Sequence, residues 1–214
     1  MSEETEIISS DQNKTDFKSF LLNNKKSIIS IVAILLIALF SYFFYTDYKR
    51  DNRVKISEQY NSVLISYDNN NPGLSVEGMK NLINIKDPTY SPLALYFLLD
   101  NNLLSNQTEI NQYFDVLINE TNLDEEVKNL IIYKKGLYNS DNASEEELLN
   151  IFKPLINSEN LWKSHSLYII AEYFFAKNEK QKSKEFFEKI LEMENANPQI
   201  KVEAQKRLQR DFSV

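Results

Sequence analysis

Residues 27–45 have the sequence SIISIVAILLIALFSYFFY, nineteen residues without a charge. As an α-helix rising about 1.5 Å per residue, this stretch would be roughly 28 Å long, close to the ~30 Å hydrocarbon core of a bilayer. Two lysines precede it, its last four residues are aromatic, and Lys49 and Arg50 follow shortly after. An aromatic band followed by cations is typical of a membrane–water interface. We therefore predict a transmembrane anchor at residues 25–46, with the bilayer as partner of residues 27–45.

Two other interpretations of this stretch fit less well. A cleaved signal peptide has an apolar core of about 7–15 residues that closes on a small-residue cleavage site. The present core is longer, ends in aromatic residues, and follows a polar tail at residues 1–24, of which residues 1–13 are expected to be disordered. A buried helix of a soluble protein would need apolar surface around it, and no other segment offers enough.

The charges beside the anchor do not give its orientation. Within about fifteen residues, four Lys/Arg lie on each side, so the positive-inside rule does not choose between them. They are Lys14, Lys18, Lys25 and Lys26 before the anchor, and Lys49, Arg50, Arg53 and Lys55 after it.

Composition limits what the rest of the chain can bind. The seven Lys/Arg and seven Asp/Glu of residues 1–53 cancel, so residues 54–214 carry the whole net charge of −7. An acidic domain argues against nucleic acid as a partner, because it lacks a dense basic face. The absence of cysteine excludes disulfides, thiolate catalysis and cysteine-bound zinc.

Apolar periodicity, scarce glycine and turn signals predict an all-α domain at residues 47–214. A capping box is expected at Ser144–Glu147, and Asn197–Pro198 and Ser91–Pro92 are expected to cap and start helices. The expected helices are 47–67, 74–85, 91–99, one from 108, 124–138, 144–154 (kinked or ended by Pro154), 162–177, 181–194 and 198–211, the last a solvent-facing cap whose apolar residues are Ile200, Val202, Ala204 and Leu208.

These helices form pairs that begin near residues 91, 125 and 161, at intervals of 34 and 36 residues. A period of about 34 residues with two helices per unit is the tetratricopeptide signature. The third unit matches best, at Ala171, Phe174, Ser183, Phe187 and Ile190. We predict a tetratricopeptide-like α-solenoid of helical hairpins, with an irregular helical bundle as the alternative. Some of its many Tyr and Phe side chains are expected to line a concave binding face.

The sequence contains no set of residues that would be expected to form a catalytic site. His165 is the only histidine and is interpreted as structural, and Gly136 belongs to no phosphate-binding loop. The acidic groups at 124–126 and 145–147 lie at helix starts, where carboxylates favour the helix dipole. We therefore expect a protein that is not an enzyme, with no catalytic, cofactor-binding or metal-binding residues.

The order of these features resembles one known family, the ancillary subunit of the bacterial SecYEG translocon. The resemblance covers nearly the whole chain, although the family's glycines in the helix turns are mostly absent here. It is carried by Phe17 and Phe20 before Lys25-Lys26, the single anchor with its aromatic exit, Ser57-Glu58-x-Tyr60, Ser91-Pro92-Leu93-Ala94, the Ala171, Phe187 and Ile190 unit, and a charged last helix with Ala204 and Leu208.

This resemblance implies a location and partners. It implies a single-pass protein of the bacterial inner membrane, with residues 1–24 cytoplasmic and the repeat domain periplasmic. The partners would be the SecYEG translocon, a periplasmic chaperone of the prolyl-isomerase type, and emerging polypeptides, with no catalysis, cofactor or metal.

Two functions are open at this point. The first is a non-enzymatic adaptor or chaperone at the Sec translocon that binds proteins or peptides. The second is a membrane-tethered scaffold for another cell-envelope complex. A domain facing the cytoplasm is a third possibility, which the equal charge counts permit.

Overall fold

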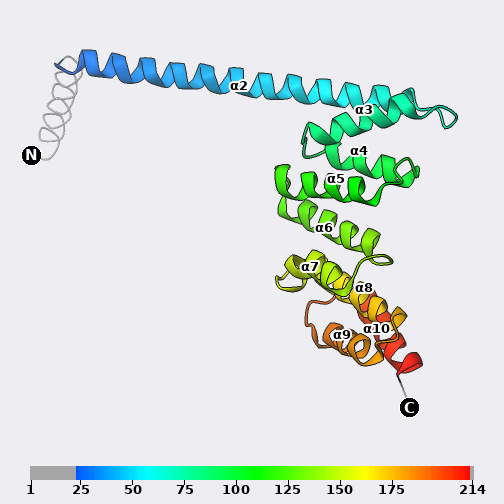
Figure 1. Cartoon of the computed structure of the whole chain (residues 1–214). Helices are drawn as coiled ribbons and strands as arrows, with labels where there is room; N and C mark the ends of the chain where they lie inside the picture. The colour runs from blue at the N-terminus through cyan, green and yellow to red at the C-terminus, as the bar shows by residue number, and fades with distance from the viewer. Residues whose placement is uncertain (1–22, 213–214) are drawn as a thin grey trace, which may run out of the picture. The chain divides into compact units, whose positions relative to one another are not determined.

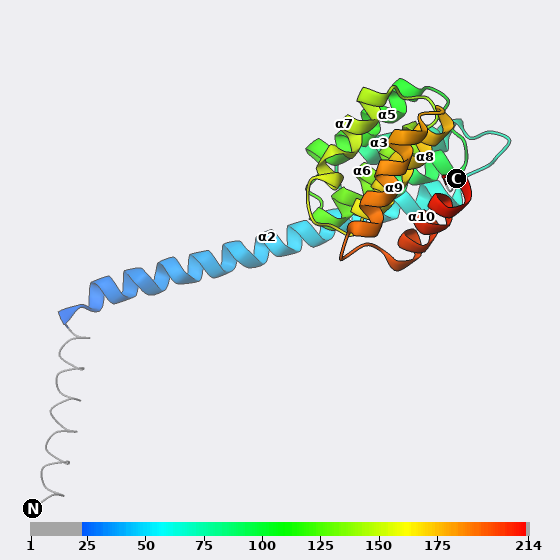
Figure 2. The same cartoon turned by 90° about the horizontal axis from the view of Figure 1, so that it is seen from below.

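The computed structural model describes residues 23–212, and every regular element in that range is an α-helix (Figures 1 and 2). Residues 1–22 of the predicted tail, among them Phe17 and Phe20, lie outside the described residues. The chain forms two compact units, residues 1–55 and residues 56–214. The predicted boundary between anchor and domain, after residue 46, lies within one continuous helix.

The first described helix, α2, runs over Lys25–Ile65 and contains both the predicted anchor and the predicted helix that follows it. Glycine and proline are absent from this range, so nothing in the backbone interrupts the helix. Its apolar side chains between residues 29 and 45 are exposed, and the helix is long and apolar enough to cross a membrane. None of the residues in its most apolar window is buried.

The second unit contains the end of α2 and eight further described helices, and the predicted helix ends agree to within one or two residues. These helices are α3 (Gly73–Asn84), α4 (Tyr90–Asp100), α5 (Gln107–Glu120), α6 (Glu125–Asn139), α7 (Glu145–Ile156), α8 (Lys163–Ala176), α9 (Lys180–Glu192) and α10 (Pro198–Asp211). They follow one another in chain order (Figure 1).

Two predicted helix starts are confirmed. The Ser144 side chain accepts a hydrogen bond from the Glu147 amide, and the Glu147 carboxylate accepts one from the Ser144 amide, which is a capping box. Asn197 caps α10 by accepting from the Gln199 and Ile200 amides, with Pro198 as the first helical residue. Pro154 lies inside α7, which ends two residues later.

The predicted cap at Ser91 is wrong. The Asp87 carboxylate instead accepts hydrogen bonds from the amides of Thr89 and Tyr90, at 2.9 and 2.8 Å, so α4 begins at Tyr90. Ser91 is buried inside the helix, and its hydroxyl donates to the Leu82 carbonyl of α3 at 2.7 Å. This bond ties α4 to α3.

The core consists of three successive clusters of buried side chains. The first lies mainly among α3, α4 and α5 around Leu98 and Phe114, the second among α6, α7 and α8 around Phe152, and the third among α8, α9 and α10 around Phe187. Two helices contribute to two clusters each. In α6, Ile131 belongs to the first and Ile132 to the second; in α8, Ile170 belongs to the second and Ala171 to the third.

The pairing of helices differs from the predicted one at the N-terminal side. Helix α4 was expected to pair with α5, but it packs more closely on α3, and α3 also contacts α5. The Ser91 hydrogen bond and the short Asp87 turn hold α3 against α4. The predicted pairs α6–α7 and α8–α9 both pack closely, and all five repeat positions of the third unit are buried.

Gly136 sets the distance between α6 and α7. A Cβ atom at this position would overlap the Phe152 ring, so only glycine lets the ring pack against the α6 backbone. The only structural role that the described residues give Gly136 is close helix packing.

The last helix is less simple than a solvent-facing cap. Ala204 is buried as expected, but Val202 is 51% exposed. Arg207, one of the charged residues of this helix, is buried. Its guanidinium donates to both carboxylate oxygens of Glu172 in α8 and to Asp211. It also lies 4.3 Å from the centre of the Phe175 ring, a cation–π contact that helps to hold α10 on α8.

Candidate functional site: an amide-lined pocket between α5, α6 and α7

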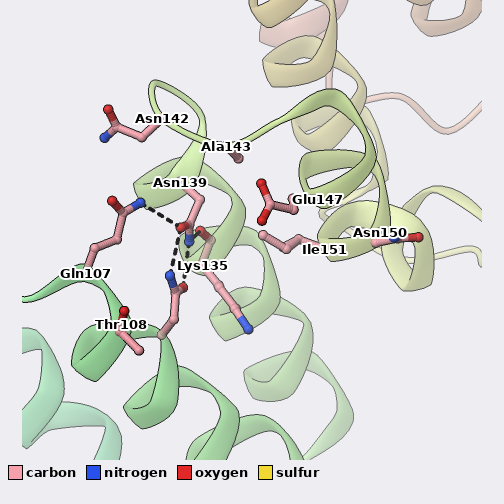
Figure 3. A pocket seen from close by; sticks show the side chains of 10 residues that line it. Gln107, Thr108, Lys135, Asn139, Asn142, Ala143, Glu147, Asn150 and Ile151 are labelled. Carbon is pink, nitrogen blue, oxygen red and sulfur yellow. Dashed lines mark hydrogen bonds between the residues drawn. The ribbon is translucent and has the colours of Figure 1, made fainter.

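A pocket of about 520 Å³ lies where the start of α5, the end of α6 and the first turns of α7 meet (Figure 3). Its polar lining is dominated by side-chain amides, and we call it the amide pocket. The uncharged polar residues that line it are Gln107, Thr108, Asn111, Asn139, Asn142 and Asn150. Glu147 and Ile151 reach toward it from α7 (Figure 3).

Asn139, the last residue of α6, is the centre of the pocket's hydrogen-bond network and is only 4% exposed. Its carbonyl oxygen accepts from Gln107 Nε2 at 3.2 Å and from Asn111 Nδ2 at 3.0 Å. Its amide nitrogen donates to Asn111 Oδ1 at 2.8 Å and to the Lys135 carbonyl at 2.7 Å. All four hydrogen-bonding positions of this amide are therefore occupied, which fixes its orientation.

The side-chain amides of Asn111 and Gln107 have hydrogen-bonding positions that the network does not use. Asn111 forms a two-way pair with Asn139 and has one further N–H and one further lone pair. Gln107 donates one N–H to Asn139, and its carbonyl oxygen accepts no hydrogen bond from residues 23–212. The side chains of Asn142 and Asn150 make no hydrogen bond within residues 23–212. The pocket thus presents open donor and acceptor positions on Gln107 and Asn111, two side chains that hydrogen bonds to Asn139 hold in place.

The charged side chains at the pocket already have partners. Lys135 Nζ lies 2.7 Å from Asp115 Oδ1. The Glu147 carboxylate accepts from the Ser144 amide and hydroxyl at 2.9 and 2.7 Å, and these bonds, the backbone bond first, lower the pKa of Glu147. The amides are consequently the groups most able to bind a ligand. A side-chain amide can donate to a peptide carbonyl and accept from a peptide N–H at the same time.

We predicted no binding residues from the sequence, and we did not anticipate this pocket. The available signal was the pair Gln107 and Asn111, four residues apart and therefore on one face of a helix. That spacing does not reveal Asn139, which lies 28 residues further along the chain from Asn111.

His165, which the sequence analysis interpreted as structural, lies outside the amide pocket. His165 in α8 is packed against Trp162 and Tyr133, with ring centres 5.4 and 5.9 Å away. Its Nδ1 atom is buried and has no hydrogen-bond partner in the described chain. Across residues 23–212, no group of three or more His, Cys, Asp or Glu side chains could hold a metal ion.

No protein-family model, curated protein or solved structure matches this chain.

Proposed function

We propose that this protein is a membrane-anchored, non-enzymatic adaptor or chaperone that binds polypeptide segments with its helical domain. The observation that carries the proposal is the amide pocket. Its central amide is immobilised by four hydrogen bonds, and the amides around it keep free donors and acceptors. Amides held in this way suit an extended peptide backbone, which offers alternating N–H and C=O groups.

Binding through backbone groups would be largely independent of the partner's sequence. Each peptide unit carries one donor and one acceptor whatever its side chain, so the same amides can serve many polypeptides. A pre-ordered site also avoids part of the entropy cost of binding, because its side chains are already fixed. Both properties suit a protein that receives varied segments in transit.

The tetratricopeptide-like solenoid is part of this proposal. Three core clusters in series, with α6 and α8 each shared between two of them, are what a short solenoid of helical hairpins would have. The described helices α4, α6 and α8 begin at Tyr90, Glu125 and Lys163, near the intervals expected for a tetratricopeptide-like repeat. The close α3–α4 pair is the main departure from that pattern.

The location and partners are proposed from the apolar helix and the resemblance. Helix α2 would anchor the chain in the bacterial inner membrane, with the N-terminus cytoplasmic and residues 56–214 periplasmic. The SecYEG translocon and a periplasmic prolyl-isomerase-type chaperone would be its neighbours, and emerging polypeptides its clients.

Site-specific photocrosslinking in native membranes tests this function. A photoreactive residue at Asn150, on the exposed rim of the pocket, is expected to capture secreted polypeptides and Sec channel subunits. The matched control carries the same residue at Val202, which is exposed on α10 and lies outside the pocket. Failure to recover any Sec subunit or secreted chain from Asn150 would contradict the proposal.

Protease accessibility tests the topology separately. If the domain is periplasmic, protease should cleave it in spheroplasts while the inner membrane is intact. If the domain is protected until that membrane is lysed, it lies in the cytoplasm. That result would contradict the proposed association with the Sec translocon.

A second candidate function is a scaffold for another envelope complex. Exposed apolar side chains on α4 and α6, among them Leu93 and Leu137, favour a folded partner that would cover them. This alternative predicts a stoichiometric partner after purification in mild detergent. Recovery of many unrelated secreted chains would argue against it.

A further inference from the structure

A second pocket, of about 670 Å³, lies at the starts of α6 and α8, whereas the amide pocket lies at the end of α6. It forms where the first turn of α6, the α7–α8 connection and the α9–α10 connection meet, and it shares no lining residue with the amide pocket. We call it the aromatic pocket. The residues that carry the argument are Glu126, Glu159, Leu161, Trp162 and His165.

Aromatic and apolar groups form one wall of this pocket. The Trp162 ring is stacked on Tyr133 with ring centres 5.0 Å apart and an angle of 24° between the planes. His165 lies 5.4 Å from Trp162. Leu161, the residue before Trp162, is 72% exposed. The wall thus offers apolar and aromatic surface to a ligand.

Hydrogen bonds hold the pocket's two connections in place. Asn160 accepts from the Trp162 amide at 2.9 Å and donates to the Leu155 carbonyl at 2.8 Å. On the other side, the Asn197 amide donates to the buried Ser164 hydroxyl at 3.2 Å. These bonds fix Trp162 and the α9–α10 connection against α8, so the pocket is formed before any ligand arrives.

The charged residues that line this pocket are both acidic. Glu126, in the first turn of α6, has no ion pair within residues 23–212. Glu159 contacts Lys163 at 2.5 Å, but its side chain remains 75% exposed. No lysine or arginine lines the pocket, and residues 54–214 carry the whole net charge of −7. The field in the pocket therefore favours a cation.

We infer that the aromatic pocket takes a lysine or arginine side chain of a bound polypeptide. The aliphatic stem of that side chain packs on Leu161 and Trp162, and its cationic head lies near Glu126 and Glu159. Aromatic faces attract cations, and long basic side chains place apolar stems on apolar surface while their heads stay near water. This inference rests on the proposed function and names the class of segment that is bound, one with a basic residue.

The chain carries its own reporter for the test, because Trp162 is its only tryptophan. The full-length protein in dodecyl maltoside micelles is titrated with three peptides that differ only at one central residue, which is lysine, glutamine or glutamate. Tryptophan emission reports the aromatic pocket, and the anisotropy of a dye on the peptide reports binding anywhere on the protein.

The lysine peptide is expected to change Trp162 emission and to bind about tenfold more tightly than the glutamine peptide at low salt. The double substitution Glu126→Gln and Glu159→Gln should remove this preference. The double substitution Glu188→Gln and Glu192→Gln, an equal change of charge on α9 outside the pocket, should keep it. Equal binding of the three peptides, or a preference that survives the double substitution at Glu126 and Glu159, would overturn the inference while leaving polypeptide binding intact. If no peptide binds by anisotropy, both the proposed function and this inference fail.

Discussion

Two tyrosines with buried hydroxyl groups show how such a group can add to stability or detract from it. The Tyr173 hydroxyl donates to the Ala143 carbonyl at 3.2 Å, whereas the Tyr96 hydroxyl is buried and has no partner among the described residues. Tyr173→Phe should lower the free energy of unfolding by about 1 kcal/mol, because it leaves a carbonyl without its donor. Tyr96→Phe should leave it unchanged or raise it. Urea unfolding of both variants checks this, and an equal loss in the two would contradict it.

Tyr113 makes stability depend on pH at the alkaline end. Burial, followed by its 3.0 Å hydrogen bond to Glu109, raises the pKa of Tyr113 from 10.0 to about 12. A raised pKa means that the folded state favours the neutral phenol. Its contribution is complete below pH 10 and is lost as the pH rises from 10 to about 12.

Removing that phenol tests the effect. Tyr113→Phe should reduce the fall in unfolding free energy between about pH 9 and about pH 11, because the phenylalanine ring has no proton to lose. Urea unfolding at the two pH values gives the measurement. The same fall in the variant and the parent protein would show that other groups are responsible.

At this scale the sequence predicts local contacts and misses distant ones. The capping box at Ser144 and the cap at Asn197 depend on residues two or three positions away, so the sequence contains them in full. The amide network joins Gln107 to Asn139, 32 residues away, and Arg207 binds Glu172, 35 residues away. Such partners become visible only when the helices are placed together.

Among the helices, the contact between α6 and α7 offers a sharp test. Gly136→Ala should lower the unfolding free energy by roughly 1–3 kcal/mol, because the new methyl group overlaps the Phe152 ring in a packed core. Gly73→Ala is the matched control, since the nearest atom to a Cβ there is 4.0 Å away. Thermal unfolding of both variants decides, and a loss of equal size at Gly73 would contradict the packing argument.

The helices themselves were largely predictable, because apolar periodicity and turn residues are local signals. The start of α4 was not, because the Asp87 side chain displaced the expected Ser91 cap. The burial of Arg207 beside the Phe175 ring was also not predictable, because a charged residue in a polar helix is normally solvated. Helix positions follow from pattern, whereas the role of each exposed or buried polar residue depends on its neighbours in space.

Over the whole second unit, the three core clusters should respond separately to damage. Phe187 is fully buried in the third cluster and Phe114 in the first. Phe187→Ala should speed amide hydrogen exchange in α9 and α10 and leave α3–α5 nearly unchanged, because the two clusters share no helix. Phe114→Ala should do the reverse. Faster exchange throughout in either variant would show a single cooperative core.

The arrangement of the helices was the least predictable level. Periodicity gave the number of helical segments and the approximate intervals between them, but the choice of partner for α4 came from side-chain hydrogen bonds that periodicity does not contain. The same limit applies to the amide pocket, which three helices build together.

The sharing of α6 and α8 between clusters also has a mechanical consequence. Clusters joined in this way act in series when the domain is pulled along the chain, so the weakest opens first and the others stay folded. If the domain binds a polypeptide as proposed, a force that pulls this polypeptide away would extend the domain in steps. Each step would dissipate part of the load, and the opened hairpin could refold once the load was gone.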